Sequence, residues 1–398
     1  MSPTGWPMTL TAIFLAVAGP VATYLLWNRV RGPRPVRAVS RLAMIGVSQA
    51  LAILLFGVVV NNYYGLYASW DDLLGDTGSP GVIIHDDKIV AGGVPTPGLD
   101  LPSGSRSGGD SRGGRGPVVP VVPRDRPAGP DQRFDRYGDD ALVTSFTGPK
   151  SGLGGQNDVM VWLPPQYNDP AYADTNFPVV MLFPGYPGTP QTWFGNMAGQ
   201  KELARLVQAK ASTPFVLAAV NISPVKGVNT DCTDIPDGPQ VATYIAEDVR
   251  SMLERTFRVT TDRSGWGMMG YSEGGLCAGK LLVQYPQDFA AAVQMSGDVR
   301  PGGYVNRYGP DFANRNSTLW MLRNHKPHQP VALLAAASAE DASGTVLTDA
   351  LSLQSAAPDV VDVLKKEHGS HNTEVWKQWL PQAYGWLSEH LDPVKPQP

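Results

Sequence analysis

The stretch GMMGYSEGGLCAGK, residues Gly267–Lys280, places one serine between glycines where an apolar run changes to helical spacing. The run before it predicts a buried strand, and the residues after it predict a helix beginning near Gly274. A strand that turns at once into a helix strains the backbone of the serine between them, and small residues at Gly270 and Gly274 let the two segments pass closely. The alternative is a glycine-rich turn that serves only compact packing. The strand before and the helix after favour Ser272 as a nucleophile at the carboxyl edge of a sheet.

The residue after the serine supplies a second chemical group. Glu273 stands where the predicted helix begins, so its backbone N–H lies at the positive end of the helix dipole. Such an N–H can stabilise the oxyanion of a tetrahedral intermediate that forms in front of the serine. We therefore expect the Glu273 N–H to be an oxyanion-hole donor.

A serine nucleophile needs a base, and with this motif the acid and the histidine follow the serine in the chain. The sequence has six histidines. Four of them lie away from the expected catalytic face or in a loop before a strand: His85, His325, His328 and His390. The segment KKEHGSHNTEVWKQWL leaves His368 and His371. His368 lies nearer the end of a predicted strand, whereas His371 lies in the loop before the last helix, so we predict that His371 is the base.

The orienting acid is expected just after a strand between the serine and the histidine. The segment PVALLAAASAEDASG ends such a strand with Glu340 and Asp341, and either carboxylate could serve. Both could also be solvated loop charges. The spacing from Asp341 to Ser272 and to His371 leaves room for one helix in each gap, and we choose Asp341 over Glu340.

The residues around this segment predict an α/β domain with a mainly parallel sheet, because short apolar runs alternate with helical patterns. Helices are expected at 238–257 and 373–390, and the domain at about 133–393 with a tail at 394–398. The first two predicted strands form an opening hairpin. The eight expected strands are 141–148, 159–167, 177–186, 215–222, 264–272, 289–297, 330–341 and 360–367.

The N-terminal part predicts a membrane anchor, residues 1–75. The runs at about 8–27 and 43–60 carry no charged residue and are long enough to span a bilayer. The segment between them holds five arginines, which indicates a cytoplasmic loop and a catalytic domain on the extracytoplasmic side of the cell membrane. A cleaved signal peptide is the alternative for the first run, but no basic segment precedes it. A channel or transporter is disfavoured because neither run holds an ionisable residue.

Residues 76–132 are predicted to be a linker rich in proline, glycine and serine. Within it, GVIIHDDKIVAG could form a small hairpin turning at Asp86 and Asp87. We assign that hairpin no function.

Composition excludes several classes of function. The net charge is −4 and no basic block lies near Ser272, so a nucleic-acid partner is not expected. No cluster of histidine, cysteine and acidic residues has metal-ligand spacing, so neither a metal nor another cofactor is expected.

The catalytic domain resembles the esterase D-like branch of α/β hydrolases, which includes S-formylglutathione hydrolases, feruloyl esterases and mycolyltransferases. The resemblance rests on VWLPPQY, PVVMLFPGYPG, TDRSGWGMMGYSEGG, FAAAVQMSG and the residues from His371 to Leu380. It implies an α/β-hydrolase fold, a triad of Ser272, Asp341 and His371, and a second oxyanion donor after FPG. That donor is the N–H of Tyr186, because Pro187 has none. Many relatives carry an apolar residue at position 273, so the Glu273 carboxylate is expected to disfavour anionic substrates.

Cys232 and Cys277 are the only two cysteines. Two reduced, buried thiols are one alternative. Because the domain is expected outside the cytoplasm and both residues lie near the expected catalytic edge, we favour a disulfide between them.

These features predict a membrane-anchored serine esterase or acyltransferase that forms an acyl-enzyme on an acyl ester, with envelope lipids as candidate substrates. The triad does not distinguish hydrolysis from acyl transfer. An inactive hydrolase fold that acts as a binding or scaffold module is the alternative, and three filled triad positions count against it.

Overall fold

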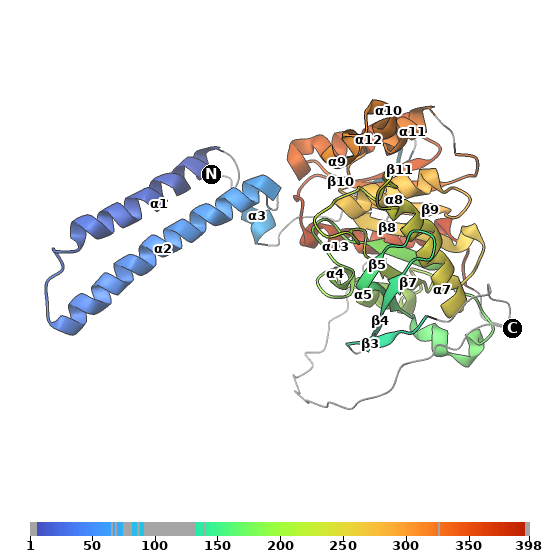
Figure 1. Cartoon of the computed structure of the whole chain (residues 1–398), viewed down its shortest axis with the longest axis horizontal. Helices are drawn as coiled ribbons and strands as arrows, with labels where there is room; N and C mark the ends of the chain where they lie inside the picture. Colours follow the sequence, from blue (N-terminus) through green and yellow to red (C-terminus); the bar gives the residue numbers. More distant parts are fainter. Residues whose placement is uncertain are drawn as a thin grey trace. The chain divides into compact units, whose positions relative to one another are not determined.

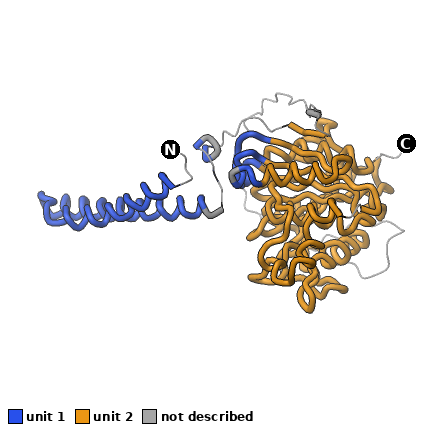
Figure 2. The backbone as a smooth tube through the Cα atoms, turned by 90° about the horizontal axis from the view of Figure 1, so that it is seen from above, with its two compact units in different colours: residues 1–79, 338–345, 366–375 blue, residues 80–337, 346–365, 376–398 orange. Residues whose placement is uncertain are grey.

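The computed structural model describes residues 6–64, 67, 70–74, 82–85, 88–90, 132–138, 140–324 and 327–394. Its internal contacts divide the chain into two compact units, which Figure 2 shows in two colours. The first unit comprises residues 1–79, 338–345 and 366–375. The second comprises residues 80–337, 346–365 and 376–398.

Two long helices form the N-terminal part of the first unit, α1 (Trp6–Leu26) and α2 (Arg34–Tyr64), followed by the short α3 (Trp70–Leu73). Both long helices are sufficiently long and apolar to cross a membrane, judged by length and composition alone. The predicted run 8–27 coincides with α1. The second helix begins before residue 43, because arginine is a good helix former and continues the helix towards the connecting segment.

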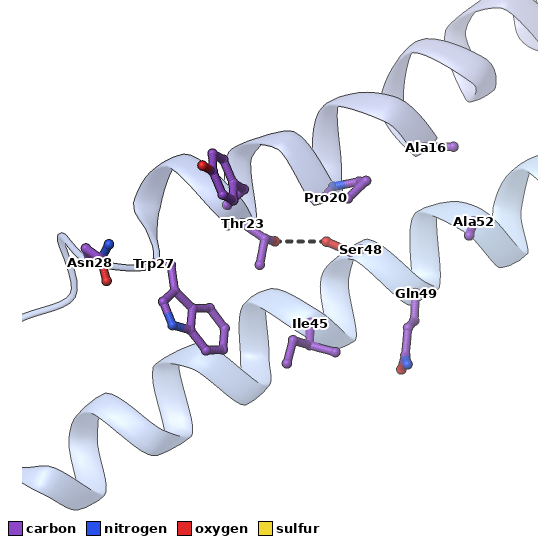
Figure 3. Close-up of a pocket in the computed structure, with 10 residues that line it drawn as sticks. Ala16, Pro20, Thr23, Trp27, Asn28, Ile45, Ser48, Gln49 and Ala52 are labelled. Carbon is purple, nitrogen blue, oxygen red and sulfur yellow. Dashed lines mark hydrogen bonds between the residues drawn. The ribbon is translucent and has the colours of Figure 1, made fainter.

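Polar contacts join α1 and α2 within this helical hairpin (Figure 3). Thr23 Oγ1 and Ser48 Oγ lie 2.9 Å apart and share a hydrogen bond. The Arg41 guanidinium stacks over the Trp27 ring at 4.7 Å and donates to the Trp27 carbonyl oxygen. These contacts fix the two helices against each other near their connecting segment.

Eleven strands form one sheet in the described part of the chain, in the order β2-β1-β11-β10-β9-β8-β6-β7-β5-β4-β3. Figure 1 labels several of them, among them β8, β9 and β10. The pairs β9–β10, β8–β9, β6–β8 and β6–β7 are parallel, whereas the pairs β5–β7, β4–β5, β3–β4, β1–β11 and β1–β2 are antiparallel. The strands are β1 (Val82–His85), β2 (Lys88–Val90), β3 (Asp135–Tyr137), β4 (Ala141–Thr147), β5 (Gly154–Trp162), β6 (Val179–Phe183), β7 (Val216–Val220), β8 (Trp266–Tyr271), β9 (Ala291–Met295), β10 (Ala332–Ser338) and β11 (Val361–Lys366).

The connections reverse direction at β6. The chain passes from β6 to β7 on one side and then to β8 on the other side of β6. A crevice at the carboxyl ends of the strands is expected at such a switch point, and ligands of open α/β sheets bind there. The segments that leave β6 and β8 are therefore the first places to look for a site.

Helices connect these strands. Both helices that the sequence analysis predicts, at 238–257 and 373–390, are present. The predicted helix 238–257 contains α6 (Val241–Thr243), the π-helical segment η3 (Tyr244–Val249) and α7 (Arg250–Thr256), and the predicted helix 373–390 is α13 (Thr373–His390). The others are α4 (Gln191–Phe194), α5 (Gly199–Gln208), α8 (Glu273–Gln284), α9 (Gly303–Asn306), α10 (Pro310–Arg315), α11 (Thr318–Asn324) and α12 (Thr345–Ala356).

Both faces of the central strands are buried. On β6, Val179 and Met181 belong to an apolar cluster that includes Leu253 of α7 and Leu281 of α8, whereas their neighbour Val180 is buried outside that cluster. Because side chains alternate along a strand, Val180 lies on the opposite face of the sheet from Val179 and Met181. That opposite face is therefore covered by a second set of residues. On β8, a Cβ added to Gly267 would lie 2.9 Å from a Leu391 methyl group, so the chain after α13 packs closely there.

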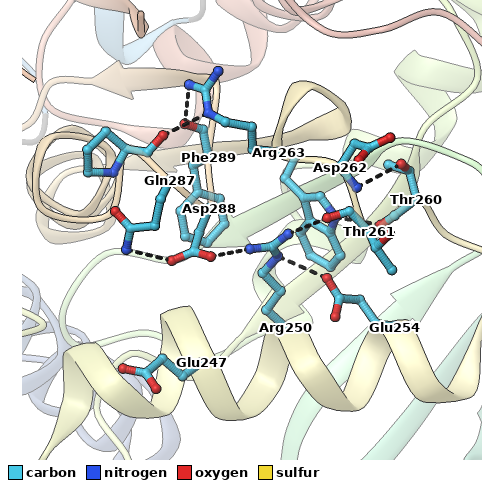
Figure 4. A network of polar contacts seen from close by, with 12 residues as sticks. Glu247, Arg250, Glu254, Thr260, Thr261, Asp262, Arg263, Gln287, Asp288 and Phe289 are labelled. Carbon is cyan, nitrogen blue, oxygen red and sulfur yellow. Dashed lines mark hydrogen bonds and ion pairs between the residues drawn. The ribbon is translucent and has the colours of Figure 1, made fainter. Parts of the chain in front are cut away.

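A polar network holds the amino end of β8 (Figure 4). Arg250 of α7 forms ion pairs with Glu254 at 3.1 Å and with Asp288, and donates to the Thr261 carbonyl oxygen at 2.9 Å. Its guanidinium also stacks over the ring of Trp266, the first residue of β8, at 4.9 Å. The strand that leads to Ser272 is thus fixed at its start.

All eight predicted strands are present, and the mainly parallel α/β fold is confirmed. The hairpin predicted at 81–92 also forms, but β1 pairs with β11 and extends the sheet. Part of the segment assigned to a linker therefore pairs into the sheet, where β1 lies between β11 and the edge strand β2. Residues 76–81 and 91–131 of the predicted linker lie outside the described residues, as do Asp86 and Asp87, where the hairpin was expected to turn.

Candidate active site

Ser272 lies at the turn between β8 and α8, in the second unit. Its backbone has φ 56° and ψ −125°, a strained conformation for a residue other than glycine. Its N–H donates to the Met295 carbonyl oxygen at 2.9 Å, and its carbonyl oxygen accepts from the N–H of Gly275 at 2.9 Å. The strand thus passes into the helix at a single residue, as the sequence pattern predicts.

The flanking glycines are required by close backbone contacts. A Cβ at Gly270 would lie 2.0 Å from the Gly274 carbonyl oxygen. A Cβ at Gly274 would lie 2.2 Å from the carbonyl oxygen of Phe183, the last residue of β6. Both distances are far below van der Waals contact, so the steric reason given for the two glycines is confirmed.

The segment after β6 packs beside the serine. A Cβ added to Gly185 would lie 3.2 Å from Ser272 Cβ and 3.2 Å from the Tyr271 ring. The Tyr271 hydroxyl hydrogen-bonds the Gly185 backbone and the Thr192 side chain, while burial raises the pKa of Tyr271 to about 12. The next residue, Tyr186, is 42% exposed. The peptide between Gly185 and Tyr186 therefore lies against the turn that carries Ser272.

Asp341 and His371 lie together in the first unit. His371 Nδ1 is 3.1 Å from both carboxylate oxygens of Asp341. The Asp341 side chain is 1% exposed, whereas that of His371 is 25% exposed. A buried carboxylate that faces Nδ1 orients the imidazole and favours the tautomer with its proton on Nδ1.

The other acid and the other histidine pair with each other. His368 Nδ1 is 3.1 Å from Glu340 Oε1, and Glu340 Oε2 accepts from the Gly369 N–H at 2.8 Å. The His368 side chain is 71% exposed. This arrangement separates the four candidates from the sequence into one buried pair and one surface pair.

The structure also joins Cys232 and Cys277 by a disulfide. Cys277 lies on α8, one turn after Glu273, and Cys232 lies in the loop before α6. The disulfide therefore ties that loop to the helix that begins at the nucleophile turn.

The sequence analysis expects the side chain of Glu273 to be a charged carboxylate, and the structure differs on this point. Burial, together with the nearby charge of Asp231, raises the pKa of Glu273 to about 8. The carboxyl group is thus mostly protonated at neutral pH, and the repulsion of anionic substrates expected from a carboxylate is weak. The sequence shows the glutamate but not the loop that covers it.

Sequence reasoning did not assign a role to Trp376. Its Nε1 donates to Ser296 Oγ at 3.0 Å, and its ring stacks on Tyr271 with centroids 4.5 Å apart. Tyr271 directly precedes Ser272, so Trp376 packs against the end of β8 that leads to this serine. The only sequence signal was the spacing of this tryptophan after His371.

Among the described residues, no group of three or more histidine, cysteine and acidic side chains is arranged to hold a metal ion.

Comparison with known proteins agrees with this geometry. The model of a family described as putative esterase matches residues 151–387, more than half of the chain. An uncharacterised protein of Corynebacterium glutamicum is 26% identical over 250 residues, which cover 58% of this chain and 57% of that protein. The aligned part thus spans little more than half of the relative's length.

Two solved structures show the same fold at low identity. A ferulic acid esterase superposes with a TM-score of 0.53 and 16% identity, and the match covers 63% of this chain and 98% of that one. An S-formylglutathione hydrolase from Agrobacterium tumefaciens superposes with a TM-score of 0.52 and 15% identity, covering 68% and 100%. The resemblance to esterase-type α/β hydrolases is therefore confirmed.

Proposed function

This chain belongs to the putative esterase family, and from that premise we propose that it is a membrane-anchored serine esterase that acts on acyl esters through an acyl-enzyme. Ser272 is the nucleophile, His371 is the general base and Asp341 orients the imidazole. The backbone N–H groups of Glu273 and Tyr186 stabilise the oxyanion. No cofactor takes part in this reaction.

The strained turn at Ser272 is the observation that carries the proposal. A non-glycine residue at φ 56° is costly unless the surrounding structure fixes it, and such strain is concentrated at functional sites. Here the strained residue lies directly between the last residue of β8 and the first residue of α8, which leaves the N–H of Glu273 at the first position of a 12-residue helix. The first N–H groups of a helix have no intrahelical partner and attract negative charge.

The Asp341–His371 pair supports the assignment of the base. With Nδ1 facing the buried carboxylate, Nε2 is the nitrogen that takes the proton from Ser272 Oγ. The oxygen then attacks the ester carbonyl, the alcohol leaves with that proton, and the acyl group remains on Ser272. Asp341 follows β10 and His371 follows β11, two strands of the sheet that also contains β8.

The acceptor of the acyl group decides the final product. Attack by water completes hydrolysis, whereas attack by a sugar or lipid hydroxyl completes an acyl transfer. We place the domain on the extracytoplasmic side, anchored by α1 and α2, where lipid esters of the cell envelope are the accessible substrates. Hydrolysis is the basic activity that family membership supports.

The test uses the full chain purified in detergent. A fluorophosphonate probe should label Ser272, and the protein should hydrolyse p-nitrophenyl butyrate. Ser272→Ala should abolish both signals, whereas His368→Ala should retain most activity because His368 pairs with Glu340 at the surface. A folded chain that is neither labelled nor active would contradict the proposal and favour a binding or scaffold module.

A further inference from the structure

A cluster of buried polar groups lies beside the nucleophile turn and has no part in the mechanism above. Lys280 of α8 is fully buried, and its Nζ donates to Thr233 Oγ1 at 2.7 Å and to the Asp231 carbonyl oxygen. The disulfide from Cys232 to Cys277 lies between these two contacts in the sequence. Together they hold the loop of residues 229–233 against α8.

The backbone of this loop is strained where it meets the helix. Asp231 and Cys232 have φ values of 50° and 52°, which residues other than glycine rarely adopt. The Asp231 N–H donates to Asn229 Oδ1 at 3.1 Å, and Asp231 Oδ2 accepts from the Gly302 N–H at 2.6 Å. Asp231 thus connects the loop to the segment that follows β9.

The side chain of Glu273 reaches the same loop. Its carboxyl group hydrogen-bonds the side chains of Asn229 and Asp231, and its Oε1 atom is buried without a hydrogen-bond partner among the described residues. A buried, unpaired oxygen would be very costly on a charged carboxylate and costs much less on a neutral acid. Two carboxyl groups in contact also hold one proton between them at lower cost than two negative charges.

The surroundings indicate which acid carries that proton. Burial is the main influence on Glu273 and raises its pKa, which favours the protonated form of Glu273, while Asp231 Oδ2 already accepts a hydrogen bond from the Gly302 N–H. The charged groups that face Glu273 among the described residues are Asp231 and Lys280. Burial lowers the pKa of Lys280 to about 7, so most Lys280 amines are neutral once the pH reaches 8.

We propose that Glu273 is a positioning residue whose protonated carboxyl group donates a hydrogen bond to the Asp231 carboxylate. This bond ties the first residue of α8 to the loop that the disulfide and Lys280 hold in place. The backbone N–H of the same residue is the oxyanion donor, so the bond fixes the direction of that donor. The inference rests on the proposed esterase function and adds a role for the side chain of Glu273.

The pH dependence follows from the proton on Glu273. Below pH 8 the carboxyl group is protonated and the hydrogen bond is present. As the pH rises through about 8, Glu273 ionises, the donor is lost and two negative charges face each other. The oxyanion donor should then lose its alignment, and kcat should fall on the alkaline side.

The experiment compares Glu273→Leu and Glu273→Gln in the full chain, with p-nitrophenyl butyrate as substrate between pH 6 and 9.5. Ser272→Ala supplies the background rate. Glu273→Leu cannot donate to Asp231, and its kcat should fall by roughly 10- to 100-fold with KM within about twofold, as expected for a misaligned catalytic group. Glu273→Gln keeps an uncharged donor, so it should recover most of the lost kcat and should not show the alkaline fall.

Glu254→Gln is the matched control, because Glu254 is another acid whose pKa burial raises, in the network around Arg250. It should keep the alkaline fall of the wild type. Equal kcat for wild type and Glu273→Leu, or the same alkaline fall in Glu273→Gln, would overturn the inference. If Glu273→Leu does not fold, the comparison of the wild type with Glu273→Gln still decides. A wild type without labelling or activity would instead contradict the proposed function.

Discussion

Two adjacent acids, Glu340 and Asp341, pair with two histidines that are only three positions apart in the sequence. The Asp341–His371 pair combines a buried carboxylate with a partly exposed imidazole, which suits a base that must meet substrate. The Glu340–His368 pair is largely exposed, and ion pairs of that kind contribute little. The difference in burial therefore favours Asp341 over Glu340 as the orienting acid. The sequence alone does not show which of the two acids is buried.

Asp341→Asn tests the role of the acid. The amide can present its NH2 group to His371 Nδ1, which favours the wrong imidazole tautomer, so kcat should fall by roughly 10³- to 10⁴-fold with little change in KM. Steady-state hydrolysis of p-nitrophenyl butyrate measures this effect. Glu340→Gln is the matched control and should remain within about threefold of the wild type. A large loss in Glu340→Gln with an active Asp341→Asn would transfer the role to Glu340.

For single residues, the sequence predicted those structural roles that depend only on residues nearby in the chain. Gly270 and Gly274 flank the serine, and the sharp turn alone explains why neither tolerates a side chain. The partners of Glu273 could not be predicted in the same way. Asn229 and Asp231 are more than 40 positions away, and only the folded loop brings them to the start of α8.

Helix α8 and the loop 229–233 form the central pair of elements beside the serine. The helix supplies Glu273, Cys277 and Lys280 at spacings of four and three residues, so all three lie along one side of it. The loop contributes the Asp231 carbonyl oxygen, the disulfide sulfur of Cys232 and the Asp231 carboxyl group to that side. The contacts with the loop thus extend over two turns of the helix that begins directly after Ser272.

Reduction of the disulfide should loosen this pair of elements. The bond closes a segment with a sequence separation of 45 residues, and its loss should cost on the order of 4 kcal/mol of unfolding free energy by chain entropy. We expect a lower thermal midpoint and a lower kcat for the full chain after treatment with a reductant. The double variant Cys232→Ser, Cys277→Ser should show both losses without reductant and should not respond to it. An unchanged midpoint and kcat after complete reduction would contradict this role.

Among the elements, the buried strands were the most predictable. Val179–Phe183 and Val216–Val220 are continuous apolar runs, as expected for strands covered on both faces. Strand β1 was recognised only as part of an isolated hairpin with β2, because its other partner, β11, lies almost 280 positions later in the sequence. Strand β3 was missed, since its three residues Asp135–Tyr137 are all exposed and carry no apolar pattern.

For the whole molecule, patterning indicated an α/β fold with a mainly parallel sheet and the apolar N-terminal helices, whereas the esterase-type branch was implied by the resemblance of particular motifs to esterase D-like hydrolases. The fold follows from the order of strands and helices, which local patterns reveal. The side of the membrane on which the domain lies is a different kind of property. It depends on the charges beside the helices, and the redox environment of that side then decides whether the disulfide persists.

The last prediction concerns that side. Five arginines lie in or near the connection between α1 and α2, namely Arg29, Arg31, Arg34, Arg37 and Arg41, and such a cluster is retained in the cytoplasm. The catalytic domain should therefore face outward. A membrane-impermeant fluorophosphonate probe added to intact cells should label Ser272, and Ser272→Ala should remain unlabelled.

The thiols supply an independent readout in the same cells. Cys232 and Cys277 should react with a maleimide reagent only after denaturation and reduction, because an oxidising compartment preserves the disulfide. Deletion of residues 1–64 should move the protein from the membrane fraction to the soluble fraction, since both apolar helices are then absent. Labelling of Ser272 only after the membrane is opened, with thiols that react without reduction, would place the domain in the cytoplasm. The substrates would then be soluble esters or thioesters, because envelope lipids would lie on the far side of the membrane.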